Sequence, residues 1–189
     1  MIRNALQDMI AWKNREARKP LVLKGVRKVG KTSLMHEFGK NYYSGYVYFN
    51  FGEENELKNI FEANKDPKRI VELLSLIAGE KILPEKTLII LDEIQECEAA
   101  VNALKLFQKK ASEYHVIAAG SLLGTLIAQS EFFLDDMIDL LEIHPLHFDE
   151  FLAATDESLH TYYLGIEKGQ LIEETFHSRL LAAYKNYLV

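Results

Sequence analysis

The chain has 189 residues, 48% apolar and 26% charged, which suits one globular domain with a sizeable core. Its single cysteine excludes an internal disulfide, and the N-terminal segment is too polar for a secretory signal. The longest weakly polar stretch, residues 116–128, is too short and too broken to cross a bilayer. We therefore expect a soluble, cytoplasmic protein with no membrane partner.

The net charge of −6 is unevenly distributed, because residues 1–40 are net basic and the remainder is net acidic. The basic part could focus an anionic nucleotide, or bind nucleic acid. The interpretation we favour is simpler: an amphipathic helix containing Ile10 and Trp12 has a solvated basic end, formed by Lys13, Arg15, Arg18 and Lys19. The acidic remainder does not support nucleic-acid binding by this chain alone.

After this opening helix, strand and helix patterns alternate along the chain. Strands are predicted at residues 20–24, 45–51, 87–91, 114–119 and 138–143, and helices at residues 32–40, 54–63, 66–78 and 99–110. Such alternation predicts an α/β fold, with a mainly parallel sheet of about five strands covered by helices on both faces. We expect a core at residues 1–144 and a helical extension at residues 145–189.

The loop between the first predicted strand and the next helix carries the strongest signal. Residues 25–32 (GVRKVGKT) fit GxxxxGK[ST], the phosphate-binding loop of P-loop NTPases, whose fold is a three-layer α/β sandwich. Backbone N–H groups and the helix N-terminus would cradle phosphate oxygens, while Lys31 would reach the β- and γ-phosphates. The predicted nucleotide contacts are Gly25, Val26, Arg27, Lys28, Val29, Gly30, Lys31, Thr32 and Ser33.

A second motif ends the strand predicted at residues 87–91. Asp92 and Glu93 follow an apolar run, as in the Walker B motif. Asp92, together with the Thr32 hydroxyl, would hold Mg²⁺. Adjacent residues on a strand point to opposite faces, so Glu93 is expected to face a water beside the γ-phosphate, which it would orient or deprotonate. Asp92 and Glu93 therefore predict a metal ligand and a catalytic base.

A third candidate, Ser121, follows the strand predicted at residues 114–119. A small polar residue there can sense the γ-phosphate or the catalytic water, the role we favour, and Ser121 could also be a helix N-cap. Arg27 could contact phosphate, a neighbouring subunit or solvent. Beyond the loop the chain has only Arg69 and Arg179, and neither lies in a motif that would place it as an arginine finger. We therefore expect slow basal turnover.

Together these segments resemble a family of bacterial and archaeal AAA-type ATPases of the ASCE division. The matching stretches are RKPLVLKGVRKVGKTSLMHEFGK, YVYFNF, TLIILDEIQEC, YHVIAAGSLLG and HPLHFDEFLAA. The resemblance implies ATP rather than GTP, and a parallel sheet in which another strand separates the two motif-bearing strands. It also implies that Lys31 and Thr32 contact phosphate and Mg²⁺, Asp92 holds the metal, Glu93 is the base and Ser121 the sensor.

The chain departs from that family in two places. At residues 133–138 (FLDDMI), Asp136 and Met137 replace a glycine and a basic residue, which bears on hydrolysis more than on binding. The family also continues into a C-terminal domain of poorly understood role beyond the position of Val189. We therefore expect this chain to represent the ATPase part of a longer architecture.

The leading hypothesis is an Mg²⁺-dependent ATPase domain that couples its ATP or ADP state to a partner domain. The alternative is a nucleotide-gated interaction module that binds ATP with little or no hydrolysis. A small-molecule kinase is less favoured, because the acidic segment 131–142 offers no arginine-rich lid. A nucleic-acid motor would require salt-dependent binding to DNA or RNA.

Overall fold

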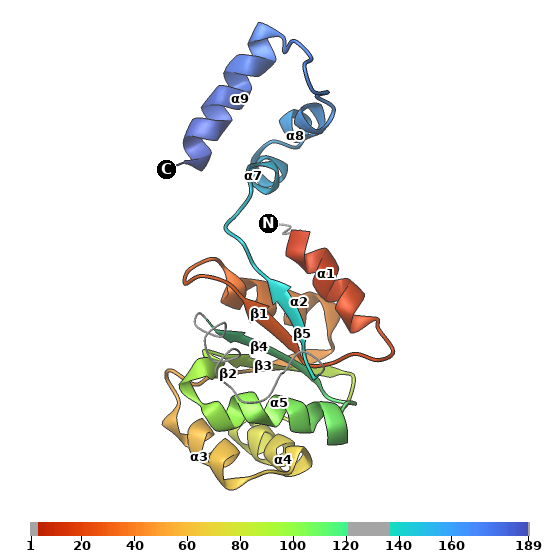
Figure 1. The fold of residues 1–189 in the computed structure, drawn as a ribbon, viewed down its shortest axis with the longest axis vertical. Coiled ribbons are helices and arrows are strands. Elements are labelled where there is room, and N and C mark those ends of the chain that lie inside the picture. The colour runs from red at the N-terminus through yellow and green to blue at the C-terminus, as the bar shows by residue number, and fades with distance from the viewer. Residues whose placement is uncertain (1–3, 121–136, 189) are drawn as a thin grey trace. The chain divides into compact units, whose positions relative to one another are not determined.

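The computed structural model describes residues 4–120 and 137–188, and residues 21–142 contribute the strands of a five-stranded sheet (Figure 1). The strands lie in the order β2-β3-β4-β1-β5, and every neighbouring pair is parallel. This confirms the predicted α/β fold. The strands are β1 (Leu21–Lys24), β2 (Gly45–Asn50), β3 (Thr87–Asp92), β4 (His115–Gly120) and β5 (Asp139–Glu142).

One face of the sheet is covered by α1 (Asn4–Lys13) and α2 (Lys31–Tyr42) (Figure 1). Alternate strand residues such as Leu23, Ile90 and Ile117 point to this face, where they pack with Trp12 and Phe38. Each of these side chains is 2% exposed or less. The face is therefore sealed by apolar contacts that also anchor α2.

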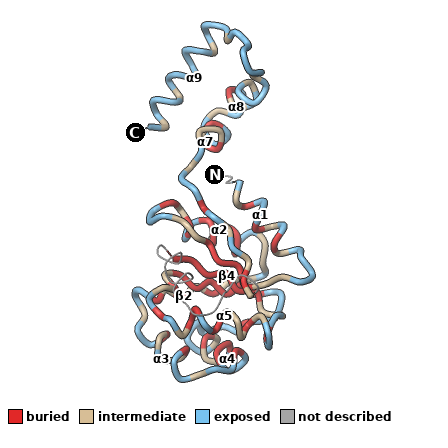
Figure 2. The backbone as a smooth tube through the Cα atoms, in the orientation of Figure 1, coloured by how far each residue is buried: buried red, intermediate tan, exposed pale blue. Residues whose placement is uncertain are grey.

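The opposite face is covered by α3 (Asn55–Ala63), α4 (Pro67–Ala78) and α5 (Glu98–Lys110). The intervening strand residues point here, and Leu91 packs in one apolar cluster with Phe49 and Phe107. With both faces covered, β3 and β4 are buried along their whole lengths (Figure 2). This explains why residues 87–91 read as a continuous apolar run in the sequence.

The strand order brings two loops together that are distant in sequence. β4 lies between β1 and β3, as the resemblance implied, and pairs with both. Because all the strands run in the same direction, their carboxyl ends lie at one edge of the sheet. The segments that follow β1 and β3 therefore emerge at the same edge, where open α/β sheets place their ligands.

Element boundaries agree with the sequence patterns to within a few residues. At α4, the Asp66 side chain accepts a hydrogen bond from the Lys68 N–H and Pro67 occupies the first turn, as expected of an N-cap. The first helix after β5 begins at Phe148, three residues later than predicted, because His147 and Glu150 form a capping box.

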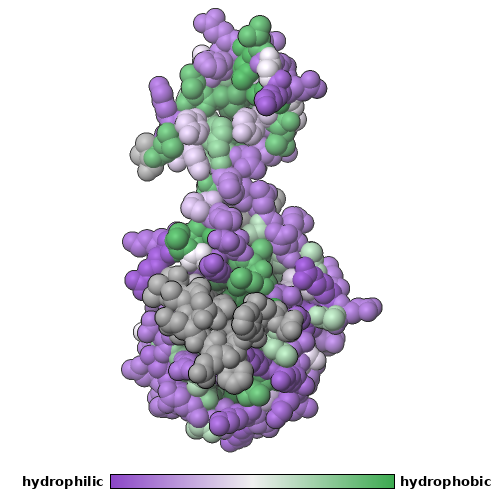
Figure 3. Space-filling model, in the orientation of Figure 1, coloured by the Kyte–Doolittle hydropathy of each residue, from purple (hydrophilic) through white to green (hydrophobic). Residues whose placement is uncertain are grey.

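The chain divides into two compact units, Ala5–Ile143 and the segment from His144 onward grouped with Asn4. The second unit holds α7 (Phe148–Thr155), α8 (Glu157–Leu164) and α9 (Glu174–Tyr187). α9 buries none of its residues, and apolar side chains lie at the surface of this unit (Figure 3). The exposed ones include Leu164, Leu171, Leu181, Tyr184 and Leu188. In the part of the chain that the structure describes, no helix has the length and apolar character needed to cross a membrane.

Candidate functional site

The loop between β1 and α2, residues 25–32, has a backbone that depends on two glycines. Gly30 has a φ of 95°, in the left-handed region that glycine adopts without steric cost. At Gly25 a Cβ atom would lie 2.4 Å from the carbonyl oxygen of Ile143, so the two backbones can approach only because a side chain is missing. Lys28 also has a positive φ, 63°, which is uncommon for a residue with a side chain and marks local strain.

Lys31 begins α2, and its side chain folds back over the loop. Its ammonium donates hydrogen bonds to the carbonyl oxygens of Gly25 (2.7 Å) and Val26 (2.9 Å). Burial lowers the pKa of Lys31, while the nearby carboxylates of Glu93 and Asp92 oppose that shift. The loop therefore holds a buried cation at the N-terminus of a helix, and both features favour anions.

Asp92 is the last residue of β3 and lies on the same face of the sheet as Ile90, toward α2. Its carboxylate is only 4% exposed and accepts hydrogen bonds at both oxygens. Oδ2 accepts from the Thr32 hydroxyl at 2.6 Å and from the Tyr48 hydroxyl at 3.0 Å, and Oδ1 accepts from the Glu93 backbone N–H at 2.9 Å. Three donors therefore hold this buried carboxylate in one orientation.

Glu93 does not continue the strand, contrary to the alternation expected from the sequence. Its φ of 49° turns the chain into a short 3₁₀ turn (Ile94–Glu96) directly after Asp92. The Glu93 side chain therefore lines the same pocket as Asp92 instead of pointing to the opposite face. The amide of Gln95 donates a hydrogen bond to Glu93 Oε2. Gln95 lies in the matching stretch TLIILDEIQEC, but the sequence assigned it no role.

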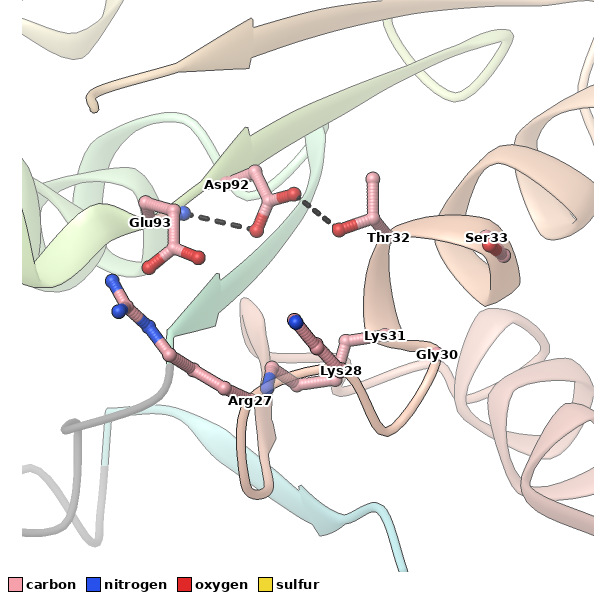
Figure 4. Close-up of a pocket in the computed structure, with 8 residues that line it drawn as sticks. All are labelled: Arg27, Lys28, Gly30, Lys31, Thr32, Ser33, Asp92 and Glu93. Atoms are coloured by element: carbon pink, nitrogen blue, oxygen red, sulfur yellow. Dashed lines mark hydrogen bonds between the residues drawn. The ribbon is translucent and has the colours of Figure 1, made fainter. Parts of the chain in front are cut away.

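The loop and the two carboxylates enclose one pocket (Figure 4). In this view Thr32 from α2 faces Asp92 from β3, with Glu93 beside Asp92. Of the other predicted nucleotide contacts, Val29 is buried in the core and Val26 is 63% exposed. Ser121, the predicted sensor, lies outside the described residues. The residues that line the pocket are Arg27, Lys28, Gly30, Lys31, Thr32, Ser33, Asp92 and Glu93.

Tyr48 contributes to the site although it belongs to neither motif. It lies on β2 at the edge of the sheet, and only the alternation of side chains along that strand could have suggested that it faces α2. Burial and the neighbouring Asp92 carboxylate both raise the pKa of Tyr48 well above its usual range. The phenol is therefore protonated at neutral pH and acts as the donor to Asp92.

The two oxygen atoms that meet at the Thr32–Asp92 contact are suitable ligands for Mg²⁺. A hydroxyl and a carboxylate oxygen lie side by side at the pocket, and Mg²⁺ prefers oxygen ligands. Among residues 4–120 and 137–188 there is no group of three or more His, Cys, Asp or Glu side chains that could hold a metal ion alone.

Several arginines outside the phosphate loop have partners within the chain. Arg69 pairs with Glu72 at 2.8 Å, and Arg179 pairs with Asp156 at 2.6 Å. Arg15 lies 3.5 Å from Asp139, and Arg18 donates to the carbonyl oxygen of Lys13. α1 ends at Lys13, so Arg15, Arg18 and Lys19 lie on the connection to β1 and not on the helix. The N-terminal basic cluster therefore makes intramolecular contacts.

A parallel sheet with this loop, a buried lysine and a Thr–Asp contact defines a P-loop NTPase. A model of the AAA domain family matches residues 17–152, and the chain therefore belongs to that family. It contains a nucleotide-binding, ATPase-type domain. A search of curated proteins found no match.

Among solved structures, the chain is similar to one titled "Structure of C. elegans PCH-2". The sequence identity is 15% and the TM-score 0.48, over 90% of this chain and 50% of that chain. The chain thus spans half the length of that protein.

Proposed function

We propose that the chain binds ATP with Mg²⁺ and hydrolyses it slowly. The observation that carries the proposal is the 2.6 Å contact between Thr32 and Asp92, in a pocket that also presents Lys31 and Glu93. Phosphoryl transfer to water needs a hydroxyl and a carboxylate that can hold Mg²⁺, a cation that binds phosphate, and a second carboxylate that positions the water. These four residues could supply those groups.

Each residue has a role that follows from its position. Lys31 exchanges its two loop carbonyls for β- and γ-phosphate oxygens, and the N–H groups of the loop and of the first turn of α2 bind the remaining phosphate oxygens. Thr32 and Asp92 hold Mg²⁺, which when bound neutralises charge on the β- and γ-phosphates. Glu93, restrained by Gln95, orients the attacking water and accepts its proton.

Ser121 completes this proposal as the sensor of the γ-phosphate, at the residue that follows β4. β4 lies between β1 and β3, so its carboxyl end emerges between the phosphate loop and Asp92. The location of the carboxyl end of β4 between these two groups is what supports a sensor role for the next residue in the sequence.

We further propose that residues 1–144 form the ATPase core, that residues 145–189 form a helical extension, and that nucleotide state is coupled through this extension to a partner domain. The exposed apolar side chains of the second unit support a role in interaction.

The alternative function is a module that binds ATP and barely hydrolyses it. The ion pairs of Arg69 with Glu72 and of Arg179 with Asp156 favour it, since both guanidinium groups already have carboxylate partners.

The deciding experiment compares phosphate release by the wild-type chain and by Glu93→Gln, which keeps the size of the side chain but removes the base. We expect measurable but slow release from wild type, and a fall of about 100-fold or more in the variant with ATP binding retained. Equal phosphate release from both proteins would rule out the ATPase function and leave the nucleotide-binding module as the proposed function. Fast, saturable wild-type turnover would contradict the expectation of slow hydrolysis.

A further inference from the structure

Tyr48 contacts the proposed metal site from outside both motifs. It lies on the edge strand β2, in register with Ile90 of β3, and its side chain reaches forward along the sheet to the end of β3. There its hydroxyl donates to Asp92 Oδ2 at 3.0 Å, the oxygen that also accepts from Thr32. The phenol therefore touches the carboxylate without itself lining the pocket.

The ring of Tyr48 is held in place by its neighbours. The imidazole of His36 packs against it with ring centroids 4.5 Å apart and planes inclined by 36°. His36 lies one helical turn after Thr32 on α2, so both side chains project from the same face of that helix. The helix that supplies Thr32 thus also supplies the surface against which Tyr48 rests.

We propose that Tyr48 is a positioning residue for Asp92, which holds the carboxylate in the orientation that accepts Mg²⁺ beside Thr32. The inference rests on the proposed function of the site. The Glu93 N–H fixes one oxygen of Asp92 through the local turn, but the other oxygen is fixed only by side chains, Thr32 and Tyr48, among the described residues. Because the Thr32 hydroxyl is itself a proposed metal ligand, Tyr48 is the side-chain donor to Asp92 that has no metal-binding role of its own.

The test is Tyr48→Phe, which removes the hydroxyl and keeps the ring that packs against His36. Tyr46→Phe is the matched control, because Tyr46 is two residues earlier on the same face of β2 and its hydroxyl lies 3.3 Å from His36 Nδ1. The primary measurement is the affinity for a fluorescent ATP analogue as Mg²⁺ is titrated, with a second series in EDTA. Thermal midpoints without nucleotide report any loss of folding.

We expect Tyr48→Phe to raise the Mg²⁺ midpoint about tenfold, the usual size of effect when a carboxylate ligand loses its supporting hydrogen bond. Affinity in EDTA should be unchanged, and Tyr46→Phe should match wild type in both series. A Mg²⁺ midpoint for Tyr48→Phe that equals the wild-type value, or lies below it, overturns the proposal.

If Tyr48 had a purely structural role, Tyr48→Phe would lower the affinity for the ATP analogue equally with Mg²⁺ and in EDTA. That result would also overturn the proposal that Tyr48 positions Asp92. Failure of the proposed function gives a different pattern. In that case the wild-type protein itself shows no nucleotide binding, or binding that Mg²⁺ does not change, and both proposals fall together.

Discussion

The Thr32 hydroxyl and the Asp92 carboxylate are 60 residues apart in sequence and 2.6 Å apart in the folded chain. Thr32 lies in the first turn of α2 and Asp92 is the final residue of β3, so neither element places the other locally. Their contact depends on β4, which pairs with both β1 and β3 and aligns their carboxyl ends. The proposed metal site is therefore a product of strand order.

Removing the hydroxyl from this contact should uncouple Mg²⁺ from nucleotide binding. For Thr32→Ala we expect Mg²⁺ to lose most of its effect on ATP affinity, a change of about tenfold or more, because one of two protein oxygen ligands is gone. Thr32→Ser keeps the hydroxyl and is the control that should behave as wild type. Isothermal titration with and without Mg²⁺ measures the effect, and equal Mg²⁺ dependence in the alanine variant and wild type would contradict it.

Lys31→Ala should remove most of the affinity for nucleotide. The ammonium is expected to make charge-assisted hydrogen bonds to two phosphates, each contributing about 1.5–3 kcal/mol, so affinity should fall by about 100-fold or more. Lys40→Ala, at the exposed end of the same helix, removes an equal charge and should have little effect. Equilibrium binding of labelled ATP provides the measurement. Unchanged binding by Lys31→Ala would refute phosphate recognition by this loop.

Gly25→Ala should weaken both folding and nucleotide binding. The added Cβ would lie 2.4 Å from the Ile143 carbonyl oxygen, so the loop or the end of β5 must shift, at a cost of about 1–3 kcal/mol in the free energy of unfolding. Gly45→Ala is the matched control, because a Cβ there meets no atom within 4 Å. Urea unfolding and ATP binding should be measured for both variants. Equal stability of the two would show that the Gly25–Ile143 approach is unimportant.

Acid should destabilise the core through His115. This histidine is 4% exposed, its Nδ1 lies 2.7 Å from the Tyr43 hydroxyl, and burial, assisted by Arg18 and Lys13, lowers its pKa to about 4. Because the ordinary value is 6.5, the unfolded chain binds a proton between about pH 6.5 and pH 4 that the folded chain does not. Stability should therefore be full above pH 6.5 and fall as the pH drops toward 4.

The matched variant for this pH dependence is His115→Gln, which cannot gain the proton. We expect it to be less stable than wild type at pH 7, since it loses the fitted imidazole, but to show a flatter decline between pH 6.5 and pH 4. Thermal unfolding at a series of pH values compares the two slopes. Parallel slopes would assign the acid sensitivity to other groups.

Much of the fold could be predicted because its elements are locally encoded. A continuous apolar run predicted the buried strand β3, and Asp66 with Pro67 predicted the start of α4. The loop at residues 25–32 was recognisable because phosphate binding by backbone N–H groups demands glycines, a lysine and a hydroxyl at set spacings. These are constraints on neighbouring residues, and such constraints survive in a linear sequence.

The sequence by itself therefore determined the alternation of elements, the phosphate loop and the presence of an acidic strand end. Only the tertiary structure decided that Glu93 turns into the pocket beside Asp92, that Tyr48 reaches Asp92 from the sheet edge, and that Gly25 faces the Ile143 carbonyl. The reason is physical. Strand order and parallel register join residues through long crossovers, and no local periodicity records which strands will be neighbours.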